Sequence, residues 1–410
     1  MPLFSAVTVE QVKSLLKKHL EGFKPETECV DLISAYNRVL AEDIFSPEDI
    51  PGFNRSTVDG FAVKAVDTFG GSEAMPALLT LVGEIGMGER PNIKLSSGEA
   101  AKIPTGGMLP EGSDAVVMLE YTQLLDDVTL CVERPVAPGE NVVAAGEDMK
   151  KGEIVFRRGH TLRPQDLGAL AALGIWEVRV AKPPVISVIS TGNEVKPPDQ
   201  SIRLGEVRDI NTYSICGQVK KWGGVPLPLG IVKDDFQELS DAVKSAVEKS
   251  DAVLLSGGSS VGSRDHTVKV IESLGKPGVL AHGLSVKPGK PTVVAVVGGT
   301  PIIGLPGHPV SAMVIFEIIA RPMISMMLGR DEDYGSAKIF ARMSRNVASA
   351  AGRQDYIRVK LERRGEEVWA VPVLGKSGLI STMVESCGLA HIPPHKQGVA
   401  QGEMVEVELY

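Results

Sequence analysis

The stretch 254-LLSGGSSVGSRDHT-267 decides how the chain is interpreted. Its apolar start ends the run DAVLL, which predicts a buried strand, and the glycines and serines that follow predict a loop before a helix. Strand and helix patterns alternate on both sides of this loop, across residues 181–328. That alternation predicts an α/β domain whose mostly parallel sheet is covered by helices on both faces.

Ligands of such domains sit beyond the carboxyl ends of the strands. Three loops fall at predicted strand ends: STGNEV (190–195), SGGSSVGSRD (256–265) and LPGHPVSA (305–312). The glycine loop has the spacing of a phosphate-binding loop at Gly257 and Gly262, but Ser263-Arg264 stands where Lys-Ser/Thr would be required. A P-loop ATPase is therefore disfavoured. Backbone N–H groups could still approach a ligand here, and a plain strand-to-helix turn is an equally good interpretation.

Charged residues accompany these loops. Lys287 and Lys290 lie in SVKPGKP and could neutralise an anion at the third loop, where a helix start offers N–H groups. Glu194, Asp234 and Asp265 follow or precede predicted elements, and each has a structural alternative, such as capping a helix.

The acids and lysines together pose an electrostatic problem. Carboxylates that line an anion site repel the anion by about 4 kcal/mol per pair at contact, for an effective dielectric constant near 20. A divalent cation between them would remove this repulsion, and oxygen ligands favour Mg²⁺. The residues alone thus predict an α/β domain that binds a phosphorylated ligand with Mg²⁺.

The whole chain has 410 residues, which favours several domains, and a net charge of −8, which argues against a nucleic-acid surface. The four cysteines are far apart, no signal peptide is evident, and no apolar run approaches the length of a membrane span, so a cytoplasmic protein is expected. We expect a discontinuous linking domain (1–45 and 146–180), an inserted β-rich domain (46–145), the α/β domain (181–328) and a C-terminal β-barrel-like domain (329–410).

Seven motifs in order give the chain a family resemblance: PGFNRSTVDGFAV (51–63), PTGGMLPEGSDAVVM (104–118), AGEDM (145–149), STGNEV, SGGSSVGSRDHT, KPGKP (287–291) and LPGHPVSA. With them, the chain resembles the molybdopterin molybdenumtransferases, the MoeA-like family that includes the gephyrin E domain. The resemblance implies a MogA/MoaB-like α/β domain. It also implies Mg²⁺-dependent insertion of molybdate into adenylylated molybdopterin, with release of AMP.

The resemblance also assigns residues. It implies a nucleotide- and metal-binding face with Glu194, Asp234 and Asp265, and an anion-neutralising role for Lys287 and Lys290. Loops at Gly257, Gly258, Ser259, Pro306, Gly307 and His308 would cradle the substrate. Catalytic roles are expected for Asp59, Asp148, Asp265 and Lys287, with Thr105 and, more weakly, Ser377 contributing to the cleft. Because family members are elongated homodimers, Asp59 would act on the α/β domain of the partner subunit.

Two positions depart from the family pattern. Gly283, with His282 beside it, replaces a frequent lysine, and His308 replaces a frequent asparagine. Either histidine could contact the oxyanion or merely pack, and tungstate in place of molybdate is open. Two other functions stay as alternatives: a non-catalytic cofactor-binding scaffold, and the molybdopterin adenylyltransferase of the same pathway. Proteins that deliver the cofactor are possible partners.

Overall fold

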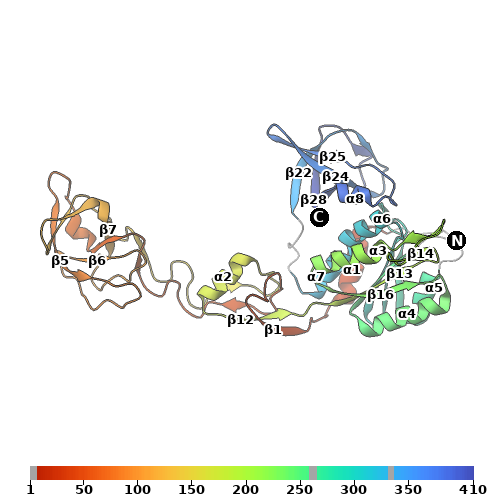
Figure 1. Ribbon diagram of the computed structural model, residues 1–410, viewed down its shortest axis with the longest axis horizontal. Coiled ribbons are helices and arrows are strands. Elements are labelled where there is room, and N and C mark those ends of the chain that lie inside the picture. The colour runs from red at the N-terminus through yellow and green to blue at the C-terminus, as the bar shows by residue number, and fades with distance from the viewer. Residues whose placement is uncertain (1–6, 258–265, 331–336) are drawn as a thin grey trace.

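The computed structural model describes residues 7–257, 266–330 and 337–410. The molecule is elongated: an inserted β domain lies at one end, a slender linking region follows, and the α/β and C-terminal domains lie together at the other end (Figure 1). The C-terminus lies in the part formed by these last two domains.

The α/β domain is built on a six-stranded sheet of order β16-β13-β17-β21-β20-β18. Its strands are β13 (Val185–Thr191), β16 (Val225–Val232), β17 (Ala252–Ser256), β18 (Pro277–His282), β20 (Val293–Val297) and β21 (Thr300–Leu305). Strands β16, β13, β17 and β21 run parallel to one another. At the other edge, β20 pairs antiparallel with β21, and β18 pairs antiparallel with β20. A mostly parallel sheet is thereby confirmed. A short ladder, β14 (Val195–Lys196) with β15 (Val207–Arg208), borders it.

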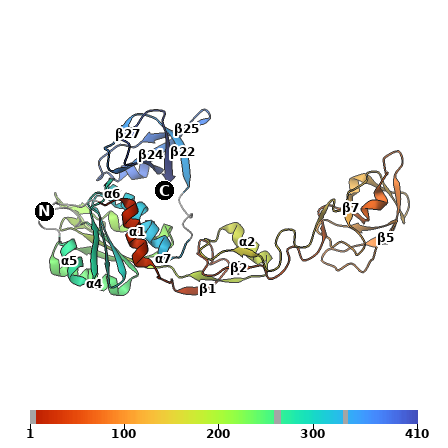
Figure 2. The same cartoon turned by 180° about the vertical axis from the view of Figure 1, so that it is seen from behind.

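Helices cover both faces of this sheet. One apolar core lies under α4 (Phe236–Lys249) and α5 (Thr267–Leu274). The other core lies under α3 (Asn211–Lys221), α6 (Pro309–Ile315), a π-helical turn (Phe316–Ala320) and α7 (Arg321–Met327). Helix α1 (Val9–Leu20) has the expected capping box between Thr8 and Gln11. It packs into this second core, beside α7, and not into the linking region where we expected residues 1–45 (Figure 2).

The continuous helix Pro309–Met327 corrects one expectation. It is long and apolar enough, with a mean hydropathy of 1.6, to meet the criteria for a membrane span, although no such run was expected. Of the most apolar 18-residue stretch of this helix, 72% is buried inside the protein, so the apolar composition is that of a core helix.

The C-terminal domain is a closed β-barrel, as expected. Its strands pair in the cyclic order β24-β25-β22-β28-β26. These are β22 (Lys338–Met343), β24 (Gln354–Arg364), β25 (Glu367–Pro372), β26 (Gly388–Ile392) and β28 (Met404–Leu409), with the pair β23 (Val347–Ala348) and β27 (Gly398–Val399) and helix α8 (Ser381–Glu385). One further strand, β19 (Val286–Lys287), comes from the α/β segment and pairs in parallel with β24. The lysine-bearing loop is therefore held by both domains, because β19 pairs with β24 while Leu284 and Val286 pack in the core of the α/β domain.

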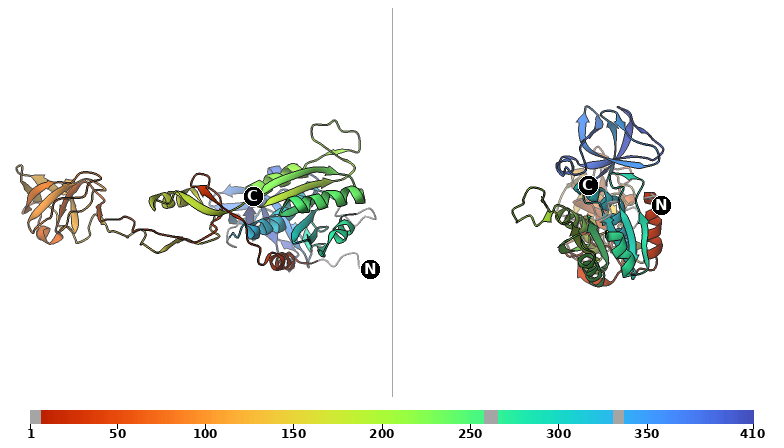
Figure 3. Two further views of the ribbon diagram at one scale, coloured as in Figure 1. Left: turned by 90° about the horizontal axis from the view of Figure 1, so that it is seen from below. Right: turned by 90° about the vertical axis from the view of Figure 1, so that its right-hand side faces the viewer.

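The linking region pairs segments from the two halves of the expected linking domain, and it continues as two extended strands towards the inserted domain (Figure 3). It contains β1 (Thr27–Asp31) with β12 (Glu177–Ala181), β2 (Ile44–Phe45) with β11 (Ile154–Phe156), β3 (Arg55–Ser56) with β10 (Val142–Val143), and helix α2 (Pro164–Ala172). The inserted domain has a sheet of order β7-β4-β6-β5-β9-β8. Its elements are β4 (Gly60–Val63), β5 (Ala77–Glu84), β6 (Glu99–Ile103), β7 (Ala115–Met118), β8 (Thr122–Leu124) and β9 (Thr129–Val132), with 3-10 turns at Ala65–Thr68 and Leu119–Tyr121.

Candidate active site

The three predicted loops begin side by side at the carboxyl edge of the parallel sheet, because β13, β17 and β21 are neighbours; of the glycine loop, the structure describes Ser256 and Gly257. Asn211, at the start of α3, ties two of them together. Its side-chain nitrogen donates to Ser256 Oγ (2.6 Å) and to the Gly307 carbonyl (2.8 Å). Gly257 has φ +102°, and a Cβ there would lie 2.6 Å from the Thr191 carbonyl oxygen, so a residue with a side chain would displace the first loop.

A cavity of about 680 Å³ opens at this edge. We call it the acidic cavity, because Glu194, Asp209 and Asp234 line it. Its walls also include Gly257, Pro306, Gly307 and His308, which were predicted substrate contacts. Gly258, Ser259 and Asp265 lie outside the described residues, so their predicted roles stay predictions.

Asp234 and Asp235 have different roles: one lines the cavity and the other caps a helix. Asp235 caps α4, because its carboxylate accepts from the backbone N–H groups of Gln237 (2.9 Å) and Glu238 (3.0 Å). Asp234 faces the cavity. Its pKa is raised, first by partial burial and then by the charge of Glu194.

Glu194 and Asp234 supply the oxygen ligands that a hard divalent cation prefers. Both residues line the acidic cavity, and their negative charges repel each other. Within the described part of the chain, no group of three or more His, Cys, Asp and Glu side chains could hold a metal. The third predicted ligand, Asp265, is outside that part. The donor set is thus compatible with Mg²⁺.

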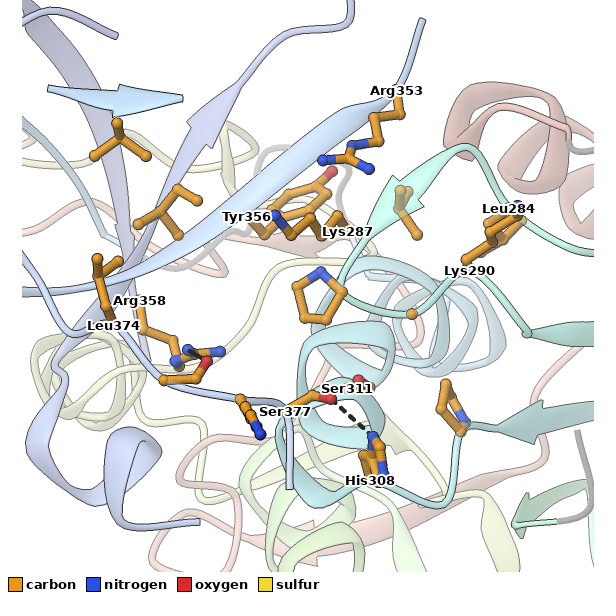
Figure 4. Close-up of a pocket in the computed structure, with 18 of the residues that line it drawn as sticks. Leu284, Lys287, Lys290, His308, Ser311, Arg353, Tyr356, Arg358, Leu374 and Ser377 are labelled. Carbon is orange, nitrogen blue, oxygen red and sulfur yellow. Dashed lines mark hydrogen bonds between the residues drawn. The ribbon is translucent and has the colours of Figure 1, made fainter. Parts of the chain in front are cut away.

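A second cavity, of about 830 Å³, lies between the α/β and C-terminal domains. We call it the cationic cavity, because Lys287, Lys290, Arg353, Arg358 and Lys376 line it (Figure 4). Ser377 also lines it, as the weak sequence match predicted. The pairing of β19 with β24 fixes its geometry, since Lys287 lies opposite Asp355 in register.

Arg358, which the sequence analysis missed, is the least expected member. Its side chain is 92% buried, and its Nε has no hydrogen-bond partner. One terminal nitrogen donates to the Gly375 carbonyl (2.9 Å), and no carboxylate pairs with the guanidinium among the residues that the structure describes. Burial lowers the pKa of Arg358, which means that the charged form lacks compensation. A bound anion would provide it.

Arg353 was also missed, and it is oriented by a fully buried partner. Its Nε lies 2.8 Å from Asp355 Oδ1. The sequence contained only a weak signal, because β24 has many charged residues and nothing in its pattern separates the buried Asp355 and Arg358 from the exposed ones. Arg353 and Arg358 line a cavity only together with residues of the α/β domain.

The two cavities adjoin. Pro291, Pro306 and His308 line both. The sequence predicted one shared pocket for acids and lysines; the structure corrects this to two neighbouring cavities with a common wall. One N–H of the predicted helix start is also used within the protein, because Val310 N donates to the Ser377 carbonyl (3.1 Å).

The two departures from the family pattern differ in outcome. His308 lies at the common wall, with its Nδ1 2.8 Å from Ser377 Oγ. His282 ends strand β18 and lines neither cavity. Gly283 has φ +97°, a conformation that strains residues with a Cβ, so the local backbone suits glycine better than lysine.

The remaining predicted residues lie towards the other end of the molecule. Asp59 accepts hydrogen bonds from Thr105 N (2.7 Å) and Thr105 Oγ1 (3.0 Å), although 46 positions separate them. These bonds lower the pKa of Asp59 and keep it ionised. Asp148 is exposed where the linking strands meet, with its N–H bonded to the Ile50 carbonyl (3.0 Å). None of the three lines either cavity of the same chain.

These features define a multidomain α/β protein with carboxylates and cations in adjoining cavities. Comparison with known proteins supplies the family. Residues 7–174 match the MoeA N-terminal region (domain I and II), residues 187–326 a probable molybdopterin binding domain, and residues 341–410 the MoeA C-terminal region (domain IV). The chain belongs to the MoeA family of molybdopterin molybdenumtransferases.

The similarity to individual relatives covers nearly all of the chain. The chain is 38% identical to a protein of Methanocaldococcus jannaschii, and the alignment covers 100% of this chain and 98% of the relative. It is 33% identical to the molybdopterin molybdenumtransferase of Haemophilus influenzae, with 98% of each covered. A crystal structure of the molybdopterin biosynthesis MoeA protein from Pyrococcus horikoshii has 37% identity, a TM-score of 0.80 and 99% coverage of both chains.

Proposed function

We propose that this protein inserts molybdenum into adenylylated molybdopterin and releases AMP. One observation supports this most directly: the acidic and cationic cavities share a wall, so a nucleotide-linked phosphate and an oxyanion can be held next to each other. The pyrophosphate-type bond of the substrate can then be cleaved when the oxyanion is in position.

The acidic cavity is the proposed place for the phosphate groups. Glu194 and Asp234, with Asp265, would hold Mg²⁺, which neutralises phosphate charge and polarises its oxygens when bound. The raised pKa of Asp234 supports this assignment, since a cation would relieve its repulsion from Glu194. Gly257 and Gly307 line this cavity at the strand ends, where a Cβ on Gly307 would lie 3.6 Å from the Gly257 Cα.

The cationic cavity is the proposed oxyanion site. Lys287 and Lys290 attract the anion, and Arg358 offers an uncompensated guanidinium with a fixed orientation. The Ser377 hydroxyl can add a hydrogen bond. Molybdate and tungstate are tetrahedral dianions with the same charge, so either fits this description of the site.

We also propose that the protein works as a homodimer in which each site combines two subunits. Asp59 and Thr105 belong to the inserted domain, which lies at the opposite end of the molecule from the α/β and C-terminal domains (Figure 1), and Asp148 belongs to the linking region between β10 and β11. A second copy would bring them to a site. The four cysteines are free, which agrees with the reducing cytoplasm as its location.

The alternatives are less consistent with the molecule. A scaffold has no need of an uncompensated buried arginine or of two carboxylates that repel each other. An adenylyltransferase would need only residues 181–328, whereas the cationic cavity requires Arg358 and Ser377 from the C-terminal domain.

The test is AMP release from adenylylated molybdopterin, measured with molybdate and tungstate in parallel, with and without Mg²⁺. We expect Arg358→Ala to lower kcat/KM for the oxyanion by about tenfold to a hundredfold, because a charge-assisted hydrogen bond is lost. Arg363→Ala, an exposed change in the same strand, is the matched control. Oxyanion-independent AMP release by the wild type would refute the proposed function. Equal effects of the two oxyanions would remove the reason to propose a tungstate specialisation.

A further inference from the structure

The side chain of His308 does not cap the helix that it precedes. His308 is the N-cap residue of α6, yet its side chain makes no capping hydrogen bond. The imidazole instead points to Ser377 of the C-terminal domain, with Nδ1 2.8 Å from Ser377 Oγ (Figure 4). His308 therefore links two domains at the wall between the two cavities.

The protonation of this ring decides what the Ser377 hydroxyl can do. When Nδ1 carries no proton, it accepts, and the Ser377 O–H must donate to it. When the ring is an imidazolium, both nitrogens donate, so Ser377 Oγ accepts and its hydrogen is released to another acceptor. In the cationic cavity that acceptor would be a bound oxyanion.

The charges around His308 come from several elements. On the cationic side are Lys287 and Lys290, Arg353 and Arg358 of β24, and Lys376 next to Ser377. On the acidic side are Glu194, Asp209, Asp234 and, as a cation, Arg208. His308 therefore lies between a group of cations and a group of carboxylates.

From this geometry we infer that His308 is a proton-linked positioning residue, which turns the Ser377 hydroxyl towards the oxyanion when the ring is protonated. The inference rests on the proposed function, because it takes the cationic cavity as the oxyanion site. Affinity for the oxyanion then rises as pH falls through the range in which histidine titrates, and by reciprocity oxyanion binding takes up a proton. Every other titratable group of the two cavities is retained in a His308→Asn variant, so comparison with that variant isolates the contribution of the ring.

The experiment is calorimetric titration of the full-length protein with tungstate alone, between about pH 6 and 8, a range that spans histidine titration. Two buffers with different ionisation heats report the protons taken up. His308→Asn keeps a hydrogen-bond donor for Ser377 but cannot titrate, so it is the conservative variant. Ser377→Ala and the double variant complete a mutant cycle, and unfolding midpoints check that each variant folds.

We expect wild-type affinity to rise by about tenfold from the upper to the lower pH, the equivalent of one charge-assisted hydrogen bond, with proton uptake. His308→Asn should lose both the rise and the uptake, and in the Ser377→Ala background His308→Asn should no longer change the pH dependence. A wild type and His308→Asn with the same pH dependence would overturn the inference and leave the proposed function intact. A wild type that binds no tungstate at any pH would instead overturn the oxyanion site itself.

Discussion

Asp234 and Asp235 are adjacent in the chain, but the physical consequences of losing each carboxylate are opposite. Asp235→Ala removes the cap of α4 and should lower the free energy of unfolding by about 1 kcal/mol. Asp234→Asn removes a carboxylate that Glu194 repels, so without Mg²⁺ it should leave stability unchanged or higher. Urea unfolding of the two variants measures both effects, and AMP release should fall in Asp234→Asn but not in Asp235→Ala.

The pH dependence of this difference has a definite sign. Because the pKa of Asp234 is raised in the folded protein, its ionised form destabilises the fold, and the penalty disappears as pH falls through that pKa. The wild type should therefore approach Asp234→Asn in stability on acidification. At neutral pH, Mg²⁺ should stabilise the wild type more than Asp234→Asn. Equal stabilisation of both proteins would argue against Asp234 as a ligand.

At the scale of elements, two glycines in different environments predict contrasting variants. Gly60 begins β4, which pairs with β7 and β6 in the inserted sheet, and a Cβ there would lie 1.9 Å from the Val117 carbonyl oxygen. Gly60→Ala should destabilise the inserted domain by about 1–3 kcal/mol and displace the neighbouring Asp59, with loss of AMP release. Gly217 is exposed within α3 with nothing within 4 Å, so Gly217→Ala should stabilise the protein by about 0.5–1 kcal/mol and keep activity. Thermal unfolding and AMP release together test the pair; a fully active, stable Gly60→Ala would contradict the role of this sheet.

The elements also show why the sequence predicted one cavity better than the other. The acidic cavity is formed by loops at the ends of β13, β17 and β21, and apolar runs followed by glycine indicate such ends locally. The cationic cavity depends on β19 leaving the α/β sheet to pair with β24, which the short pattern GLSVK cannot reveal. Arg353 and Arg358 were therefore missed, since their burial arises between domains. Helix α1 was placed in the linking region for the same reason: its apolar face is evident from the sequence, but not the core that it joins.

The whole molecule separates charges along its length. Residues 46–145 hold 15 acidic and 6 basic side chains, so the inserted domain accounts for the negative charge of the chain. The cationic cavity is lined by the α/β and C-terminal domains, which lie at the opposite end of the molecule (Figure 1). In an antiparallel pair of chains, the inserted domain of one subunit would approach the cavities of the other with complementary charge. The linking region that separates the two ends is extended (Figure 3).

This arrangement predicts complementation between two inactive proteins. Asp59→Ala and Lys287→Ala should each release little AMP alone. If each site takes Asp59 from one subunit and Lys287 from the other, a mixed dimer contains one site with both residues intact and one site with neither. Unfolding and refolding an equal mixture should then restore about a quarter of wild-type activity, since half of the dimers are mixed and each has one working site. A mixture of Asp59→Ala with Asp59→Asn is the matched control and should restore nothing. If the Asp59→Ala and Lys287→Ala mixture stays inactive despite mixed dimers on native mass spectrometry, the site is built within one subunit. Recovery in the control would mean that the regained activity does not depend on Asp59 and is not complementation.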